Sequence, residues 1–98
     1  MPFLQLKDSP AKEIFPGFYV HFVHSANMTF AHWDIRAGAL LPEHSHPHEQ
    51  VANVIAGETC ALGPGSVAII PSFAIHSGRA ITDCHIIDAF YPIREDYC

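Results

Sequence analysis

Proline and glycine are spread along the whole chain, with eight prolines and six glycines in 98 residues. Both residue types destabilise helix interiors, so long helices are nearly excluded. The only helical turn that the sequence predicts covers residues 9–13, where Ser9 can cap the turn and Pro10 can take its first position. The chain must therefore build its core from extended segments.

Alternating or continuous apolar segments lie between these turn signals. In the first of them, Phe18, Val20 and Phe22 share one face of an extended chain. Short strands separated by turns are typical of an all-β sandwich or barrel. With 98 residues, 49% of them hydrophobic, we expect one domain over residues 1–98 with a modest core. The predicted strands cover residues 18–24, 28–35, 50–56, 67–70 and 84–91.

Charge and cysteine content exclude several classes of protein. Five basic against ten acidic residues give a formal charge of -5, which argues against nucleic acid or an anionic membrane surface as a partner. No apolar run approaches the roughly 18–20 residues of a membrane span, and the start does not resemble a signal peptide. Cys60, Cys84 and Cys98 form no CxxC pair, so we expect free thiols. These features predict a cytoplasmic location.

Histidine is unusually frequent, with eight residues in 98. His44 and His46 are two positions apart, so on a strand both imidazoles project from one face and can bind the same cation. The amide oxygen of Gln50 offers a third ligand, and His76, beyond a second strand, offers a fourth. Such a donor set leaves positions open for water or substrate. A His-x-His pair by itself is also compatible with solvated loop histidines.

The spacing around the first histidines is more informative than the pair. Five residues separate Gly38 from His44, three separate His46 from Gln50, and six separate Gln50 from Gly57. This pattern resembles the first cupin motif, with Gln50 where that motif has glutamate.

A second stretch resembles the second cupin motif. Five residues separate Gly65 from Pro71, and His76 follows at the motif's spacing. Phe73 stands where the motif has glycine, and Ala80 where it has asparagine.

The two motifs imply a small β-barrel of the cupin type, a double-stranded β-helix or jelly roll, with a metal inside. The resemblance assigns one divalent transition metal ion to His44, His46, Gln50 and His76. Three nitrogens and one oxygen suit Zn, Ni, Fe and Mn alike. Only seven residues lie between Gly57 and Gly65, however, where cupins usually have a hairpin. We therefore expect a trimmed barrel with an exposed sheet edge, unless the chain lacks a segment.

Asp88 stands on the face that the last predicted strand shares with Ile86 and Phe90. A carboxyl group in an apolar run is costly to bury unless it is paired, protonated or used. The alternative is a strand shifted by one residue, with Asp88 facing water. Arg94 follows after Pro92, either as a clamp for a carboxylate or in a surface pair with Asp88, Glu95 or Asp96.

Residues 44–50, 76–84 and 87–97 resemble the KdgF-like cupins of pectin and alginate breakdown. That resemblance implies conversion of ring-form 4,5-unsaturated monouronates into linear keto sugars, with Asp88, Phe90 and Arg94 lining the active site and Gln50 binding the metal. The small-molecule partner would be a sugar acid. Two alternatives stay open: an iron-dependent dioxygenase with the same ligands, and a non-catalytic cupin that binds a sugar or effector.

The N-terminal strand carries more aromatic residues than a small interior readily hides, namely Phe15, Phe18, Tyr19 and Phe22. Apolar surface left outside the core usually marks an interface. We therefore expect a homodimer built on this strand, with one metal site per subunit. In the alternative, these aromatic side chains line the barrel of a monomer.

Overall fold

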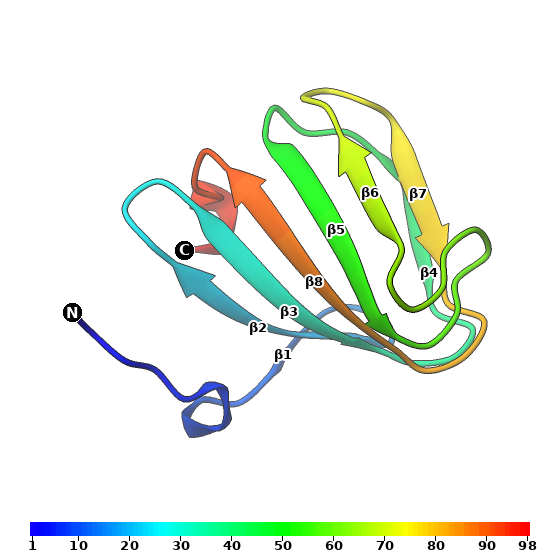
Figure 1. Ribbon diagram of the computed structural model, residues 1–98, viewed down its shortest axis with the longest axis horizontal. Coiled ribbons are helices and arrows are strands. Elements are labelled where there is room, and N and C mark those ends of the chain that lie inside the picture. Colours follow the sequence, from blue (N-terminus) through cyan, green and yellow to red (C-terminus); the bar gives the residue numbers. More distant parts are fainter.

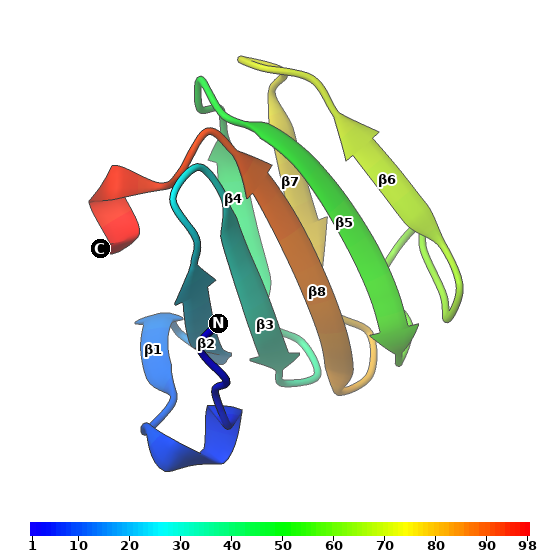
Figure 2. The same cartoon turned by 60° about the vertical axis from the view of Figure 1, so that its left-hand side comes forward.

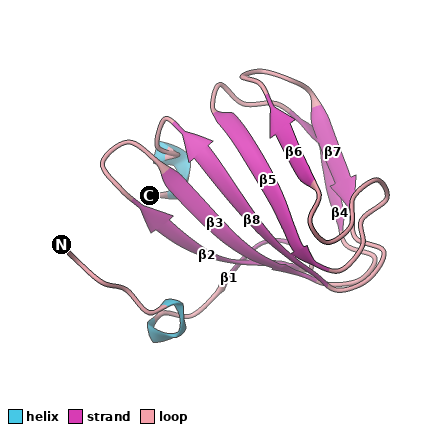
Figure 3. Cartoon of the chain, viewed as in Figure 1, coloured by secondary structure: helices cyan, strands magenta, loops and turns pink.

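The computed structural model describes residues 1–98 and is built almost wholly of strands (Figures 1 and 3). Two single 3-10 turns, η1 (Leu6–Asp8) and η2 (Glu95–Tyr97), are its only helical elements. Neither has the length or apolar character of a membrane-crossing helix. The strands are β1 (Lys12–Phe15), β2 (Phe18–His24), β3 (Thr29–Ile35), β4 (Leu40–His44), β5 (Glu49–Ala56), β6 (Val67–Ile70), β7 (His76–Arg79) and β8 (Cys84–Tyr91).

The strands form one large and one small antiparallel sheet. The large sheet has the order β1-β2-β3-β8-β5-β6, and the small sheet pairs β4 with β7. Figure 2 shows β4 and β7 behind the larger sheet, so the interior lies between the two. The predicted all-β barrel is confirmed, and the strands expected at 18–24, 67–70 and 84–91 have the predicted bounds.

The core lies on the inner face of β2, β3 and β8, where the alternation places apolar side chains. Phe18 and Val20 are buried on β2, and Trp33 is buried on the neighbouring β3. Trp33 meets the rings of Phe18 and Phe22 edge to face, with centroids 5.8 and 6.2 Å apart. Such aromatic pairs stabilise a core beyond the area that they bury. All three cysteines are free, as expected.

The N-terminal aromatic side chains are not left over for an interface. Phe18 is buried, and Phe15 and Phe22 pack against the core around it. Tyr19 alone points the other way, beside Arg36, whose guanidinium carbon lies 5.6 Å from the ring centre. The expectation that these aromatic side chains are left outside the core is therefore wrong, because the interior holds three of the four rings. The homodimer stays a prediction without that support.

The helical turn predicted at residues 9–13 is also wrong. Lys12–Phe15 is strand β1, which pairs with β2 through a hairpin that joins Phe15 to Phe18. Gly17 makes the turn with φ of 82°, a backbone conformation that glycine adopts at little cost. Pairing with β2 overrides the local helix propensity, as tertiary contacts commonly do.

The barrel is trimmed where the sequence predicted it. Between β5 and β6 the chain forms a loop whose only ladder contact is a bridge from Thr59 to Ala80. No additional hairpin joins the small sheet, so it keeps two strands. β6 ends the large sheet as an edge strand, and its Val67 and Ile69 are 55% and 76% exposed. The expected exposed edge is therefore present.

Gly57 offers a test of how tightly the end of β5 packs. It has φ of 87°, and a Cβ there would clash with the Asp83 carbonyl and lie 2.8 Å from Cys84 Cα. Gly65 has nearly the same φ but open space around it. We predict that Gly65→Ala lowers the free energy of unfolding by about 1 kcal/mol and Gly57→Ala by about 2 kcal/mol or more. Denaturant titration of both variants checks this, and equal losses would contradict the packing argument.

Phe73, which stands where the second cupin motif has glycine, has φ of 65°. Its backbone N–H donates to the His46 carbonyl at 2.7 Å, so this strained turn is tied to the segment that carries a predicted metal ligand. Its side chain is 68% exposed, so truncation of the ring removes few packing contacts and little stability. We predict that Phe73→Gly is more stable than Phe73→Ala by about 1 kcal/mol, because only glycine relieves the left-handed backbone. Parallel thermal and denaturant unfolding of the two variants measures the difference.

Candidate metal centre

Strand pairing between β4 and β7 brings two predicted ligands together. His44 is the last residue of β4, His76 is the first of β7, and the two are partners across the small sheet. His46 lies just beyond β4, in the loop that leads to β5, so the two histidines of the His-x-His pair do not share a strand as predicted. The chain bends at Pro47 and His48, which turns His46 inward.

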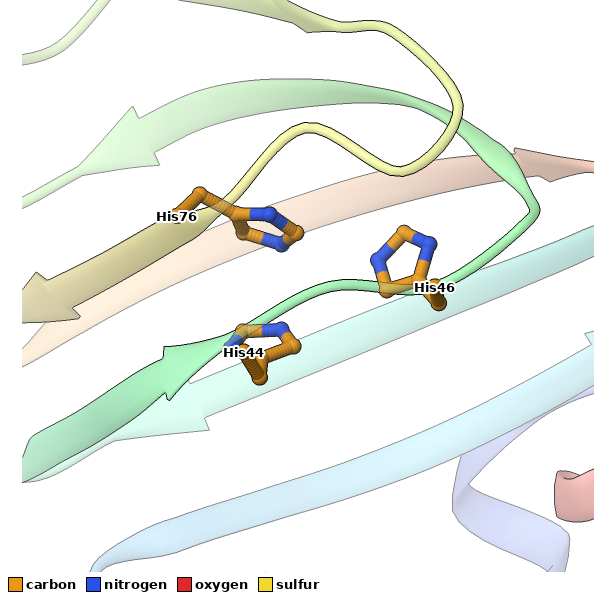
Figure 4. Close-up of side chains that lie close together, drawn as sticks. All are labelled: His44, His46 and His76. Carbon is orange, nitrogen blue, oxygen red and sulfur yellow. The ribbon is translucent and has the colours of Figure 1, made fainter.

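The three imidazoles converge on one point (Figure 4). One potential ligand nitrogen from each lies within 4.8 Å of the others. The ring centroids of His44 and His76 are 4.0 Å apart, those of His46 and His76 5.0 Å, and those of His44 and His46 5.7 Å. This spacing lets one ion contact all three rings.

Backbone carbonyls set the tautomer of every ring in the group. The Nδ1 atoms of His44, His46 and His76 each lie 2.9 Å from a carbonyl oxygen two residues away in the chain. A carbonyl only accepts, so each Nδ1 carries the proton and donates it. The Nε2 lone pair of each ring is then available for a metal, an arrangement typical of histidine ligands. The three accepting carbonyls belong to Pro42, His48 and Ala74.

The remaining polar atoms of the group are acceptors, which can bind a cation but cannot hydrogen-bond to one another. His76 Nε2 is buried and has no hydrogen-bond partner. His46 Nε2 lies 3.1 Å from Gln50 Oε1. Since Nδ1 of His46 holds its proton, both of these atoms are acceptors and cannot bond to each other. A divalent metal ion would satisfy all of these lone pairs, and the donor set agrees with one.

Electrostatics favours the metal-binding form of two of the rings. Burial lowers the pKa of both His46 and His76 from the ordinary histidine value, and the positive charge of Arg94 lowers them further. Neutral imidazole is the form that ligates metals. His46 and His76 are therefore neutral, and able to bind a metal ion, near neutral pH.

Asp88 lies on the inner face of β8, so the alternative with this residue facing water is wrong. Its strand neighbours are the small residues Ala31 and Ala52. Oδ2 accepts a hydrogen bond from Trp33 Nε1 at 3.0 Å, and Oδ1 is buried without a partner. Burial raises the pKa of Asp88 to about 6, against the opposing influence of Gln50, Trp33 and Arg94. The carboxyl group is thus able to hold or release a proton near neutral pH.

Arg94 is buried, with a side chain only 8% exposed, and it is paired. Its Nε and Nη2 donate to the two carboxylate oxygens of Asp96 at 3.0 and 2.7 Å. The guanidinium carbon lies 4.7 Å from the ring centre of Phe90 and 4.3 Å from that of Tyr97. Of the pairings left open by the sequence, the one with Asp96 forms. It joins a buried guanidinium to a carboxylate that is 55% exposed, so the pair lies at the surface on its acidic side.

One cavity of about 690 Å³ joins these groups. Sequence reasoning missed three of its lining residues as site members: Trp33, Asp96 and Tyr97. The contact of Trp33 with Asp88 depends on strand register, which no local pattern reveals. The other five histidines, among them His85 in its pair with Asp34, do not line this cavity. All seven predicted site residues do: His44, His46, Gln50, His76, Asp88, Phe90 and Arg94.

Neither a protein-family model nor a curated protein matches the sequence, but solved structures match the fold closely. KdgF from Halomonas sp. is 24% identical with a TM-score of 0.88, and the match covers 99% of this chain and 100% of that one. An RmlC-like cupin from Shewanella frigidimarina is 24% identical with a TM-score of 0.91, covering 98% and 95%.

A third match is the oxalate decarboxylase of Bacillus subtilis, at 19% identity and a TM-score of 0.79. It covers 91% of this chain but only 29% of the longer protein. The three matches share a fold across proteins of different names. Together with the two motifs and the histidine geometry, they show that this chain has the cupin fold.

Proposed function

We propose that this chain is a metal-dependent enzyme that opens ring-form 4,5-unsaturated monouronates to linear keto sugars. One observation carries the proposal: a single cavity holds three converging imidazoles, a protonatable carboxyl group and a guanidinium that uses two of its donors for Asp96. Such a reaction needs an acid/base group, a polarising cation and a clamp for the substrate's carboxylate. The fold match with KdgF from Halomonas sp. supports this choice among cupin activities.

His44, His46 and His76 would hold the metal, with Gln50 as an oxygen ligand. When bound, the ion would supply Lewis-acid polarisation and orientation of the substrate's oxygens. The oxalate decarboxylase of Bacillus subtilis has Mn(II) centres, which agrees with a divalent ion in this fold. Zn, Ni, Fe and Mn all remain compatible with the donor set.

Asp88 would be the proton donor. The substrate ring is an enol ether, and a proton from the Asp88 carboxyl group goes to C4. The oxygen of a water molecule then bonds to C5, and the proton that it releases restores Asp88. In the resulting hemiketal, the proton of the new hydroxyl passes to the ring oxygen as the bond between that oxygen and C5 breaks. A ketone at C5 remains, and no oxidant or reductant is consumed.

Arg94 would hold the substrate's carboxylate. A guanidinium has five N–H donors, and two of those of Arg94 are used by Asp96. The donors on the other edge are able to form two parallel bonds to a carboxylate. Phe90, packed between the Arg94 guanidinium and the His46 ring, would shape the space for the sugar.

Metal content tests the ligand set. We predict that His44→Ala or His76→Ala removes most of the bound metal, because each deletes one of three converging nitrogens. The matched control His85→Ala should keep a full equivalent, since His85 lies outside the cavity. Elemental analysis of purified protein measures the stoichiometry. The barrel should stay folded after chelation, because its core strands do not use the ion, and unfolding on chelation would contradict this.

Substitution of the buried carboxyl group tests the proton donor. We predict that Asp88→Asn lowers kcat at least a hundredfold with metal content unchanged, because the amide cannot supply the proton. The control Asp34→Asn, on the exposed Asp34–His85 pair, should keep normal activity. Loss of the ring double-bond absorbance of lyase-generated unsaturated uronates follows the reaction. Full activity in Asp88→Asn would overturn the assignment.

The same assay separates the alternatives. Ring opening should proceed equally under argon and in air, because the reaction consumes no oxygen. A strict need for oxygen with an iron-loaded protein would point to the dioxygenase. Binding of uronates without any turnover would point to a sugar-binding cupin.

A further inference from the structure

We infer that the turn after β8, residues 94–97, belongs to the acid-binding site and holds Arg94 in its binding orientation. Asp96 and Tyr97 are the positioning residues. The inference rests on the proposed function in one respect, that Arg94 binds the substrate's carboxylate. It adds two residues to the site and assigns the role of the C-terminal turn. Neither residue would touch the reacting atoms.

The ion pair with Asp96 occupies one specific edge of the Arg94 guanidinium. Asp96 takes Nε and Nη2, which are the two donors on the side of the group. The end of the group, formed by Nη1 and the second hydrogen of Nη2, forms no ion pair with a second acidic side chain. Arg94 and Asp96 both line the cavity. A fork-like grip on one edge thus fixes the direction in which the other edge points.

Two aromatic rings contact the same group. The guanidinium carbon lies 4.7 Å from the Phe90 ring centre and 4.3 Å from that of Tyr97. Tyr97 is itself held by Phe22 on β2, with ring centroids 4.4 Å apart and planes 23° apart. These two cation–π contacts restrict rotation of the guanidinium. Asp96 and the two rings together leave the group one orientation.

The backbone of the turn is anchored to the large sheet. The Arg94 N–H donates to Thr29 Oγ1 at 2.9 Å, and Thr29 is fully buried at the start of β3. Within the turn, the Tyr97 N–H donates to the Arg94 carbonyl at 3.0 Å. These bonds hold the side chains of Arg94 and Tyr97 at a constant distance from the strands. Preorganisation of this kind lowers the entropy lost on binding.

Electrostatics and positioning make opposite predictions for Asp96. Its negative charge partly cancels that of Arg94, so removing it should by itself strengthen the binding of an anion. If Asp96 instead holds the guanidinium in place, removing its second acceptor should weaken the binding of a carboxylate. The sign of the change therefore identifies the dominant role. A role in folding alone would change stability without changing affinity.

The experiment measures binding of galacturonate, a saturated monouronate, to the metal-loaded protein by calorimetry. Asp96→Asn should weaken binding at least tenfold, with metal content and the melting temperature close to wild type. Tyr97→Leu should also weaken it, and Asp96→Glu should recover part of the loss. The matched control Glu95→Gln removes a negative charge from the same turn at a side chain without a hydrogen bond, and it should change affinity less than twofold.

Two comparisons keep the outcome decisive. In an Arg94→Gln background, Asp96→Asn should add no further loss, because the two residues act through one contact. Unchanged or tighter galacturonate binding in Asp96→Asn overturns the inference, as does absence of galacturonate binding by the wild-type protein. Failure of the proposed function has a different signature, since the protein would then bind galacturonate with these variant effects but open no unsaturated uronate.

Discussion

The pairing of β4 with β7 is the constraint on which the site depends. These two strands make a sheet of their own, and the register that joins them puts His44 opposite His76. The imidazoles of His44 and His76 lie side by side because the strand register makes these residues direct partners. The third, His46, follows two residues later and turns inward, and its Nδ1–H donates to the His48 carbonyl. The backbone thus sets both the distance between the rings and their tautomers.

Strands with a regular alternation of apolar side chains were the predictable part of the molecule. The alternation in β2 and β8 revealed which face is buried, and it placed Asp88 inside the barrel. β7 could not be found in this way, because its four residues, His-Ser-Gly-Arg, contain no apolar side chain to alternate. β1 was misread for a different reason. Its local sequence favours a helical turn, and only the pairing with β2 makes it a strand.

Partners of the site residues were harder to predict than the residues themselves. The motif spacing identifies a histidine or an aspartate, but the group that it contacts comes from another strand. Trp33 reaches Asp88 because β3 and β8 are neighbours in one particular register. Asp96 is close to Arg94 in sequence, yet whether it pairs with the guanidinium depends on how the C-terminal turn folds back. Such contacts carry no periodic signal.

The chemistry proposed for Asp88 depends on its having few partners. A carboxylate that accepts several hydrogen bonds is stabilised in its charged form and does not hold a proton at neutral pH. Here the residues paired with Asp88 on the flanking strands are alanines, which bring no donors. The indole of Trp33 supplies one hydrogen bond and the Gln50 side chain also favours the charged form, but the effect of burial outweighs both. Arg94 lines the same cavity, yet its strongest contacts go to Asp96. The negative charge of Asp96 offsets part of the positive charge of Arg94, so Arg94 stabilises the Asp88 carboxylate less. The Arg94–Asp96 ion pair therefore both orients the guanidinium and helps Asp88 to hold its proton.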